Sequence, residues 1–392
     1  MSGAPSVVIV GAGAAGLSTA LCLAERGCDD VTVIERDHVA AASSSLSAGI
    51  YTRGYADPLD IALRVEAYER LCQFEREDGL TLRRNGFLRL ARDSATVARF
   101  ERSVALQHEL GVEDSVVLDR AGLQAHVPDM RCGDLAGGLL TPSDGYLDGQ
   151  QLCMTYAERA EALGVRVLAR HPLTGYEQLA DGRHRLETPR TALECDVVVN
   201  AAGAWAPAVG RLLAAPVEIV PERHEACVMR LAAPLGYELP SIMDYVPGSG
   251  ELGLYLRPEG DSQLIVGLHT NDLLDDPADA DAFYGGAEAA FVDALIPKLV
   301  DRMPGFESVG LESGWAGLYP NSPDERFIVG PMPGRPGVVA VCGLDGVGVY
   351  MSPVAGRMGA DSVLDGRPRD DAERDAYDPA RFNAPEPALQ RD

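Results

Sequence analysis

The sequence predicts an α/β protein in which a Rossmann-like domain, assembled from discontinuous segments, is joined to an α+β domain with an antiparallel sheet. Three observations lead to this fold class. A strand, a glycine-rich turn and a helix open the chain, segments of the same character return near residues 165–210 and 338–365, and strand-rich sequence lies between them. The length of 392 residues also exceeds that of one domain of about 150 residues, so we expect two domains.

The first unit has the order strand, helix, strand. Val7–Val10 is a short apolar run, Ala14–Arg26 carries a stripe of leucine and alanine, and Val31–Glu35 is a second apolar run. Short apolar runs bounded by glycine predict strands, and the stripe predicts the helix that connects them. Together these segments predict a βαβ unit.

Three glycines stand in the turn of this unit, in the order Gly11-x-Gly13-x-x-Gly16. Glycine lets the backbone bend sharply and approach a pyrophosphate, while the start of the helix presents free N–H groups and a partial positive charge. Glu35 follows Gly16 by 19 positions and can accept hydrogen bonds from ribose hydroxyls, which disfavours the 2′-phosphate of NADP. We therefore expect a bound dinucleotide; a tight packing turn without a ligand is the alternative.

The next elements are a loop, two helices and a strand. Residues 40–55 are small and polar, which is typical of a loop that wraps a ligand or of a flexible linker. Residues 56–79 place leucine, alanine and phenylalanine on one face of a helix. Residues 85–92 predict a strand, and residues 94–110 predict a second helix.

The rest of the chain alternates between strands and helices. Residues 137–148 are rich in glycine and proline, and we expect a loop there that enters a helix near Gly149. The elements expected after it are a strand at 165–170, a hairpin with an Asp-Gly turn at 176–188, a buried strand and turn at 195–207, strands at 217–274 with a hairpin at 255–269, a helix at 279–303, and a strand, turn and helix at 338–366.

These elements define the expected domain boundaries. We assign residues 5–85, 145–215 and 325–382 to the first domain, and residues 86–144 and 216–324 to the second. The stretch after Gly366 is rich in proline and charge, so we expect a surface tail, with residues 383–392 outside both domains.

Composition disfavours several classes of protein. The formal net charge is −25, and such a surface repels phosphate backbones, so we expect no nucleic-acid partner. No stretch approaches the ~18 apolar residues of a membrane helix, and no signal peptide is visible, so we expect no membrane partner and a cytoplasmic location. The 8 cysteines form no CxxC pair and fit reduced thiols, and the 7 histidines lack ligand spacing, so we expect no metal.

The sequence after Glu35 separates NAD from FAD as the dinucleotide. A simple NAD dehydrogenase would continue with regular βαβ units, whereas here a run of serine and other small residues follows. From this point the chain resembles the family of D-amino-acid oxidase, glycine oxidase and monomeric sarcosine oxidase. The resemblance implies a resident FAD in a Rossmann-like FAD-binding domain. The residues that match the family's small-residue loop are Ser44, Ser45, Ser47, Ala48 and Gly49.

The resemblance continues in order over residues 5–382. The family's later segments are matched by VLARHPLTGYE, VVVNAAGAWAP, YLRPEGDSQLIVGLH, WAGLYPNSPDERFIVGP and GLDGVGVYMSPVAGRMGAD. It implies that the last segment begins a helix whose N-terminus stabilises reduced flavin. Besides the small-residue loop, the implied FAD contacts are Gly11, Ala12, Gly13, Ala14, Ala15, Gly16, Glu35, Arg36, Leu173, Ala202, Gly203, Trp205, Gly317, Gly343, Asp345, Gly346, Val347, Gly348 and Val349.

Two departures from the family pattern concern the link to the flavin and the substrate carboxylate. Gly317 stands where relatives with a covalent flavin have cysteine, so we expect non-covalent FAD. Tyr319 and Tyr350 stand where relatives have an arginine and a lysine that bind the carboxylate. Either Arg53 or Arg257 replaces these anchors, or the substrate is not a simple small α-amino acid.

A third departure concerns oxygen. Sarcosine oxidase relatives use a lysine in the hairpin to activate O2 beside the flavin, whereas GLHTNDLL contains no lysine. His269 could supply positive charge there, or it could be a hydrogen-bonded hairpin residue. Oxidase and dehydrogenase both remain open.

The resemblance implies an FAD-dependent oxidoreductase that oxidises the C–N bond of a small amine or amino acid. Hydride would pass to flavin N5, and the imine would hydrolyse to a carbonyl and an amine, with peroxide formed if O2 is the acceptor. The alternatives are oxidation of a 2-hydroxy acid, oxidation or desaturation of a specialised metabolite, and a flavoprotein subunit that is active only in a larger complex. A homo-oligomer and a hetero-oligomer both stay open. The expected cavity residues are Tyr319, Tyr350, His269, Arg53 and Tyr255.

Overall fold

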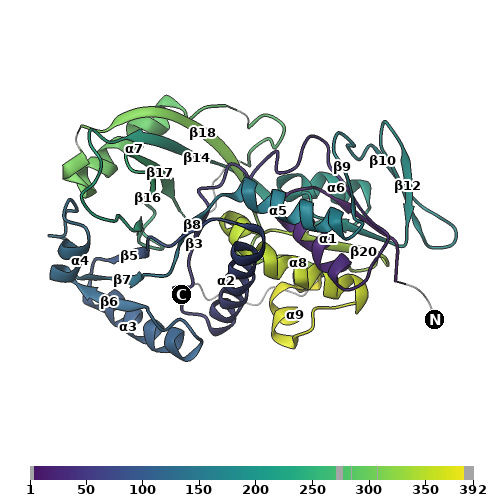
Figure 1. Ribbon diagram of the computed structural model, residues 1–392. Coiled ribbons are helices and arrows are strands. Elements are labelled where there is room, and N and C mark those ends of the chain that lie inside the picture. Colours follow the sequence, from purple (N-terminus) through teal and green to yellow (C-terminus); the bar gives the residue numbers. More distant parts are fainter. Residues whose placement is uncertain (1–3, 271–276, 284, 307, 384–392) are drawn as a thin grey trace.

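Two large sheets organise the chain, as the computed structural model in Figure 1 shows. The structure describes residues 4–270, 277–283, 285–306 and 308–383. One sheet has six strands and lies with α1 and α8, and the other has eight strands and lies with α7 and α4 at the opposite end of the molecule. This arrangement confirms the expected fold class.

The six-stranded sheet is assembled from three separated parts of the sequence. Its strands are all parallel except the edge strand β19, which runs antiparallel to β20. In spatial order they are β19 (Ile328–Pro331), β20 (Val338–Cys342), β13 (Val197–Asn200), β1 (Val7–Val10), β2 (Val31–Ile34) and β9 (Arg166–Leu168).

Both faces of this sheet are buried, which explains why its strands read as unbroken apolar runs. On one face, Val7 and Ile9 pack with α1 (Ala14–Glu25), α5 (Gly149–Ala162) and α8 (Gly348–Leu364). On the other face, Val8 and Val10 pack with α6 (Ala206–Leu212) and with the small sheet of β10 (Gly175–Gln178), β11 (His184–Glu187) and β12 (Ala192–Cys195).

The eight-stranded sheet is antiparallel except where β15 runs parallel to β5. One of its faces packs on α7 (Ala289–Arg302) and α4 (Arg120–His126). In spatial order its strands are β18 (Gly310–Asn321), β14 (Val220–Arg230), β17 (Gln263–His269), β16 (Gly253–Glu259), β15 (Ser241–Asp244), β5 (Phe87–Ala91), β7 (Gly137–Thr141) and β6 (Val116–Asp119).

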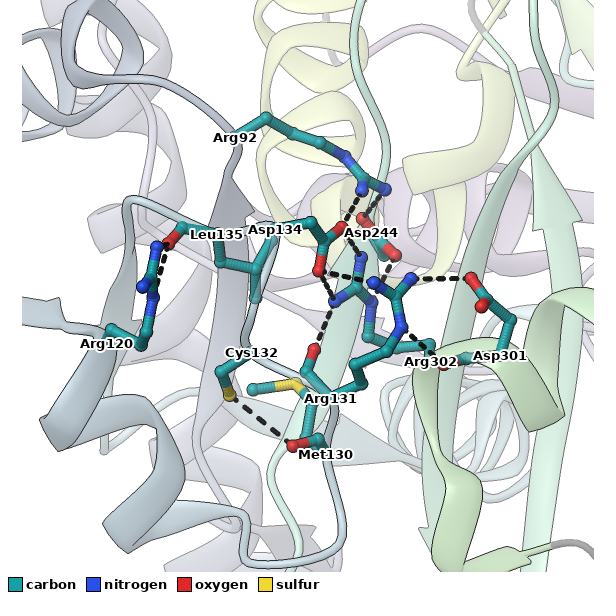
Figure 2. Close-up of polar contacts among 10 residues, drawn as sticks. All are labelled: Arg92, Arg120, Met130, Arg131, Cys132, Asp134, Leu135, Asp244, Asp301 and Arg302. Carbon is teal, nitrogen blue, oxygen red and sulfur yellow. Dashed lines mark hydrogen bonds and ion pairs between the residues drawn. The ribbon is translucent and has the colours of Figure 1, made fainter.

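A network of ion pairs holds the end of α7 against this sheet (Figure 2). Arg302, the last residue of α7, is 2% exposed and donates to Asp134 and Asp244 at 2.8 and 2.7 Å. Arg92, which follows β5, contacts the same two carboxylates. The network joins four segments that are far apart in the sequence.

The remaining elements connect the two sheets. They are α2 (Pro58–Asp78), α3 (Ser94–Glu109) and a three-stranded sheet of β3 (Ile50–Tyr51), β8 (Gly145–Leu147) and β4 (Leu82–Arg83). Every helix in the described part of the chain is too short or too polar to cross a membrane. The described residues also contain no cluster of three or more side chains suited to hold a metal.

The expectation of a loop over residues 137–148 was wrong, because this stretch forms β7 and β8. The glycines of this stretch allow neighbouring strands to pack closely and do not mark a loop. A Cβ atom on Gly137 would lie 2.6 Å from the carbonyl oxygen of Leu118, and one on Gly138 would lie 2.8 Å from that of Arg89. The glycines therefore belong to a strand that only small residues fit.

Two other expectations need correction. The helix expected at 279–303 begins only at Ala289, after the glycine pair at 285–286. The stretch after Gly366 is not a surface tail up to residue 383, because it forms α9 (Asp371–Tyr377) and a final turn. Tyr377 is buried and stacks on Phe327 with ring centroids 5.3 Å apart. Residues 384–392 lie outside the described residues, and the domain boundaries stay predictions.

Candidate cofactor and substrate site

A cavity of about 400 Å³ lies where the carboxyl ends of the parallel strands face the eight-stranded sheet. Loops after β1, β2, β13 and β20 line one side of it, and Gly317, Leu318 and Tyr319 of β18 line the other. Ligands of open parallel sheets bind at this edge, because the helix N-termini that follow the strands point there. The two sheets together therefore form the candidate site.

The turn between β1 and α1 has the shape that a pyrophosphate requires. Gly11 has a φ of +113°, and a Cβ atom there would lie 2.5 Å from the carbonyl oxygen of Ala201. A Cβ atom on Gly16 would lie 2.0 Å from the carbonyl oxygen of Gly11. The N-cap of α1 is Gly13, which has no side chain, and the first turn of the helix contains no acid. The N–H of Ala14 donates to Oγ of Ser44 at 3.0 Å. The N-terminus of this helix suits a diphosphate, because its partial positive charge attracts an anion.

Glu35 and Arg36 lie at the nucleotide end of the cavity. Glu35 accepts from the N–H of Ala12 through Oε2 and from that of Asp37 through Oε1, both at 2.9 Å. The carboxylate is thus fixed at the end of β2, where its remaining lone pairs can accept ribose hydroxyls. The guanidinium carbon of Arg36 lies 3.9 Å from the ring centroid of Trp205, which covers this end.

The loop between β20 and α8 lines the other end of the cavity. Asp345 has a φ of +44° and accepts from the N–H of Ser322 at 3.0 Å. Burial raises the pKa of Asp345 to about 8, although the hydrogen bond from Ser322 lowers it, and the nearby carboxylates of Glu325 and Asp324 raise it as well. This carboxyl group is therefore largely protonated at neutral pH and can donate a hydrogen bond into the cavity.

Tyr319 is stacked on a histidine that the sequence did not single out. The rings of Tyr319 and His224 are 3.8 Å apart between centroids and nearly parallel. Nε2 of His224 lies 3.4 Å from Oε2 of Glu222, which also accepts from Asn321 at 2.7 Å. Burial raises the pKa of Tyr319 to about 12, so its hydroxyl stays neutral. A Cβ atom on Gly346 would lie 2.6 Å from the Tyr319 ring.

Sequence reasoning missed Glu222 and His224 because their spacing on a strand carries no motif. Only the pairing of Glu222 with Tyr319 across β14 and β18 brings them next to this cavity residue. The one available signal was their spacing: residues two positions apart on a predicted strand, such as Glu222 and His224, have side chains on the same face.

Most of the predicted FAD contacts lie in the cavity. Those among its lining residues are Gly11, Gly13, Ala14, Ala15, Glu35, Arg36, Ser44, Ser47, Leu173, Ala202, Gly203, Trp205, Gly317, Gly343, Asp345, Gly346, Gly348 and Val349. The predicted contacts outside the lining are Ala12, Gly16, Ser45, Ala48, Gly49 and Val347. Two of these residues lie behind the lining: Ala12 donates to Glu35, and Gly16 packs against the backbone of Gly11.

Of the five predicted substrate residues, only Tyr319 lines the cavity. Tyr350 donates to the carbonyl oxygen of Arg64 at 2.6 Å in the core, and Arg53 is bound to Asp144. His269 ends β17 and meets the ring of Tyr245 edge-on at 5.0 Å. The ring of Tyr255 packs on Gly267, and a Cβ atom on Gly267 would lie 2.3 Å from that ring. Their catalytic roles stay predictions.

Residues 6–362 match the family described as "FAD dependent oxidoreductase". The chain belongs to this family. FAD is therefore its cofactor, and the glycine turn, the N-terminus of α1 and the Glu35 carboxylate all fit that group.

Two dehydrogenases and one solved structure are similar to the chain over most of its length. Human sarcosine dehydrogenase is 28% identical over 96% of this chain and 41% of its own length, and rat dimethylglycine dehydrogenase is 27% identical over 92% and 43%. The chain thus spans about two fifths of these curated relatives. The crystal structure of L-proline dehydrogenase from P. horikoshii has a TM-score of 0.85 at 22% identity, covering 98% of this chain and 99% of that one.

Proposed function

We propose that the chain, with non-covalent FAD, oxidises the C–N bond of an amine or amino acid. The observation that carries the proposal is the Tyr319 phenol, which lines the cavity beside Gly346, just before α8, and is stacked on His224. The three similar proteins support it, since each is named for an amino acid with at least two carbon substituents on nitrogen. A cytoplasmic location and an oligomeric state stay predictions.

When bound, FAD supplies an acceptor for a hydride from the carbon next to nitrogen. The chain must orient that carbon and hold the nitrogen unprotonated, because an ammonium has no lone pair with which to form an imine. The neutral Tyr319 hydroxyl can position the amine by a hydrogen bond. His224, whose Nε2 lies 3.4 Å from Glu222, stacks on the Tyr319 ring and holds that phenol in place.

Anaerobic mixing of the FAD-loaded chain with a panel of small molecules tests the proposal. We expect N-methylglycine, N,N-dimethylglycine or proline to remove the visible absorbance of oxidised flavin, while lactate and glycerol leave it unchanged. Reduction by a hydroxy compound but by no amine would instead favour the alternative of 2-hydroxy acid oxidation. Subsequent admission of O2 separates an oxidase, which reoxidises rapidly, from a dehydrogenase, which needs another acceptor.

A further inference from the structure

A short segment joins the two sheets at the nucleotide end of the cavity. Residues 277–283 lie between β17 and α7, so they connect elements of the eight-stranded sheet, and they form neither helix nor strand. Asp281 of this segment nevertheless lines the cavity together with Arg36 and Trp205, which follow strands of the six-stranded sheet. We call residues 277–283 the clasp, because they attach one sheet to the loops of the other.

One carboxylate makes the polar attachment of the clasp. Oδ1 of Asp281 accepts a hydrogen bond from Arg36 at 2.7 Å and another from Nε1 of Trp205 at 2.8 Å. These hydrogen bonds lower the pKa of Asp281, so its side chain is ionised at neutral pH. A single side chain of the clasp therefore bridges the loop after β2 and the loop after β13.

Apolar contacts hold the clasp beside this carboxylate. Phe283 is 2% exposed and packs in a small cluster with Leu318 and Trp205, and its ring centroid lies 6.0 Å from that of Trp205. At the other end of the clasp, the N–H of Ala278 donates to the carbonyl oxygen of Pro221 at 2.7 Å. The cluster is separate from the cores of the two large sheets, so these contacts can break without opening either core.

The polar attachment is open to water. The side chain of Asp281 is 72% exposed and that of Arg36 is 37% exposed, and an ion pair of this kind contributes little free energy. Segments with few buried contacts open locally while the rest of a protein stays folded. The contacts of the clasp with Arg36, Trp205 and Leu318 also join parts of the chain itself, so its closure does not require a ligand.

We propose that the clasp is a gate at the nucleotide end of the cavity, which must open for FAD to enter or leave. Opening requires Asp281 to release Arg36 and Trp205. Because the clasp closes with or without the cofactor, it slows uptake and release by the same factor and leaves the affinity for FAD almost unchanged. The inference rests on the FAD cofactor and does not depend on the substrate.

Stopped-flow measurement of FAD uptake and release tests the gate. Uptake is followed by the change in flavin fluorescence when FAD is mixed with the FAD-free chain, and release by the reverse change when the loaded chain is diluted. We expect Asp281→Ala to raise both rate constants about fivefold, because it removes two exposed hydrogen bonds from the closed clasp. Asp281→Asn should fall between wild type and Asp281→Ala, because its amide oxygen can still accept from Trp205 while the charge is lost.

Glu312→Ala is the matched control. Glu312 is a carboxylate outside the cavity lining that also accepts from an arginine and a second side chain, namely Arg230 at 2.8 Å and Gln263 at 2.6 Å. Both FAD rate constants of this variant should stay within about twofold of wild type. Equal melting temperatures of the FAD-free chains show that the variants are folded.

The two rate constants separate a gate from other roles of Asp281. Faster release with unchanged uptake would overturn the gate, because it would show that Asp281 contacts bound FAD directly. The gate is also wrong if neither rate constant of Asp281→Ala changes by more than about twofold. Both rate constants are measured without any amine, so these results do not depend on the proposed reaction.

Discussion

Tyr319 is the predicted substrate residue that the structure places in the cavity, and its surroundings explain what it can do there. Its ring is held between His224 and the backbone of Gly346, where any side chain would displace it. A phenol fixed in this way can act as a positioned hydrogen-bond donor, because little conformational freedom is lost when a substrate binds.

Replacing Tyr319 with Phe removes the hydroxyl and keeps the stack. We expect kcat/KM for the best amine to fall about tenfold, which is the effect of one lost hydrogen bond to a reacting group. FAD content should not change. Tyr237→Phe is the control, because Tyr237 donates to Asp129 outside the cavity lining. An unchanged kcat/KM in Tyr319→Phe would remove the hydroxyl from the site.

The buried carboxyl group of Asp345 should make the stability of the folded chain depend on pH. Its pKa, about 8 in the folded chain against 3.8 ordinarily, means that folding favours its protonated form. The stabilising contribution of the proton is therefore complete below about pH 4 and is lost as the pH rises through about 8. Asparagine also tolerates the left-handed backbone at this position.

Melting temperatures of the FAD-free chain should show this difference. Relative to wild type, Asp345→Asn should gain stability progressively as the pH is raised from about 4 to about 8, because the variant cannot ionise. Asp29→Asn, at an exposed position, is the control. Parallel melting curves of wild type and Asp345→Asn over this range would contradict the buried, protonated carboxyl group.

At the scale of elements, the ion network of Figure 2 fixes the end of α7. The hydrogen bonds from Arg302 hold the pKa of Asp134 near 2. The Asp134 carboxylate therefore stabilises the fold above its ordinary pKa of 3.8, and this stabilisation is lost as the pH falls toward 2. The network lies on the side of the sheet away from the cavity, so it should affect stability and not turnover.

Removing one partner of this buried network should be strongly destabilising. We expect Arg302→Met to lower the free energy of unfolding by about 3 kcal/mol, because it leaves buried carboxylates without their cation. Urea denaturation at neutral pH measures this, with Arg230→Met at an exposed pair as the control, which should change stability by less than about 1 kcal/mol. An equal decrease in the free energy of unfolding in both variants would show that the network stabilises the fold no more than a surface ion pair does.

Elements with local signals could be predicted from the sequence. The βαβ unit, the hairpins and the β20–α8 turn all carry glycine or apolar patterns within a few residues of one another. The strand β7 was missed because its glycines serve contacts with Leu118 and Arg89, which lie on other strands. The partners of Arg302 and the pair of Glu222 and His224 were missed for the same reason, since only the sheet register brings them together.

At the scale of the whole molecule, the cavity exists because two sheets from interleaved parts of the chain meet at one edge. The six-stranded sheet supplies the helix starts and Glu35, and the eight-stranded sheet supplies Gly317, Leu318 and Tyr319.

Anaerobic reduction by N-alkyl amino acids, followed by identification of the product, tests the central claim most directly. The account predicts that at least one of them bleaches the bound flavin and yields one imine, or the carbonyl and amine groups formed by its hydrolysis, for each flavin reduced. The account is contradicted if no carboxylate-bearing amine reduces the flavin while a 2-hydroxy acid or a polyol does.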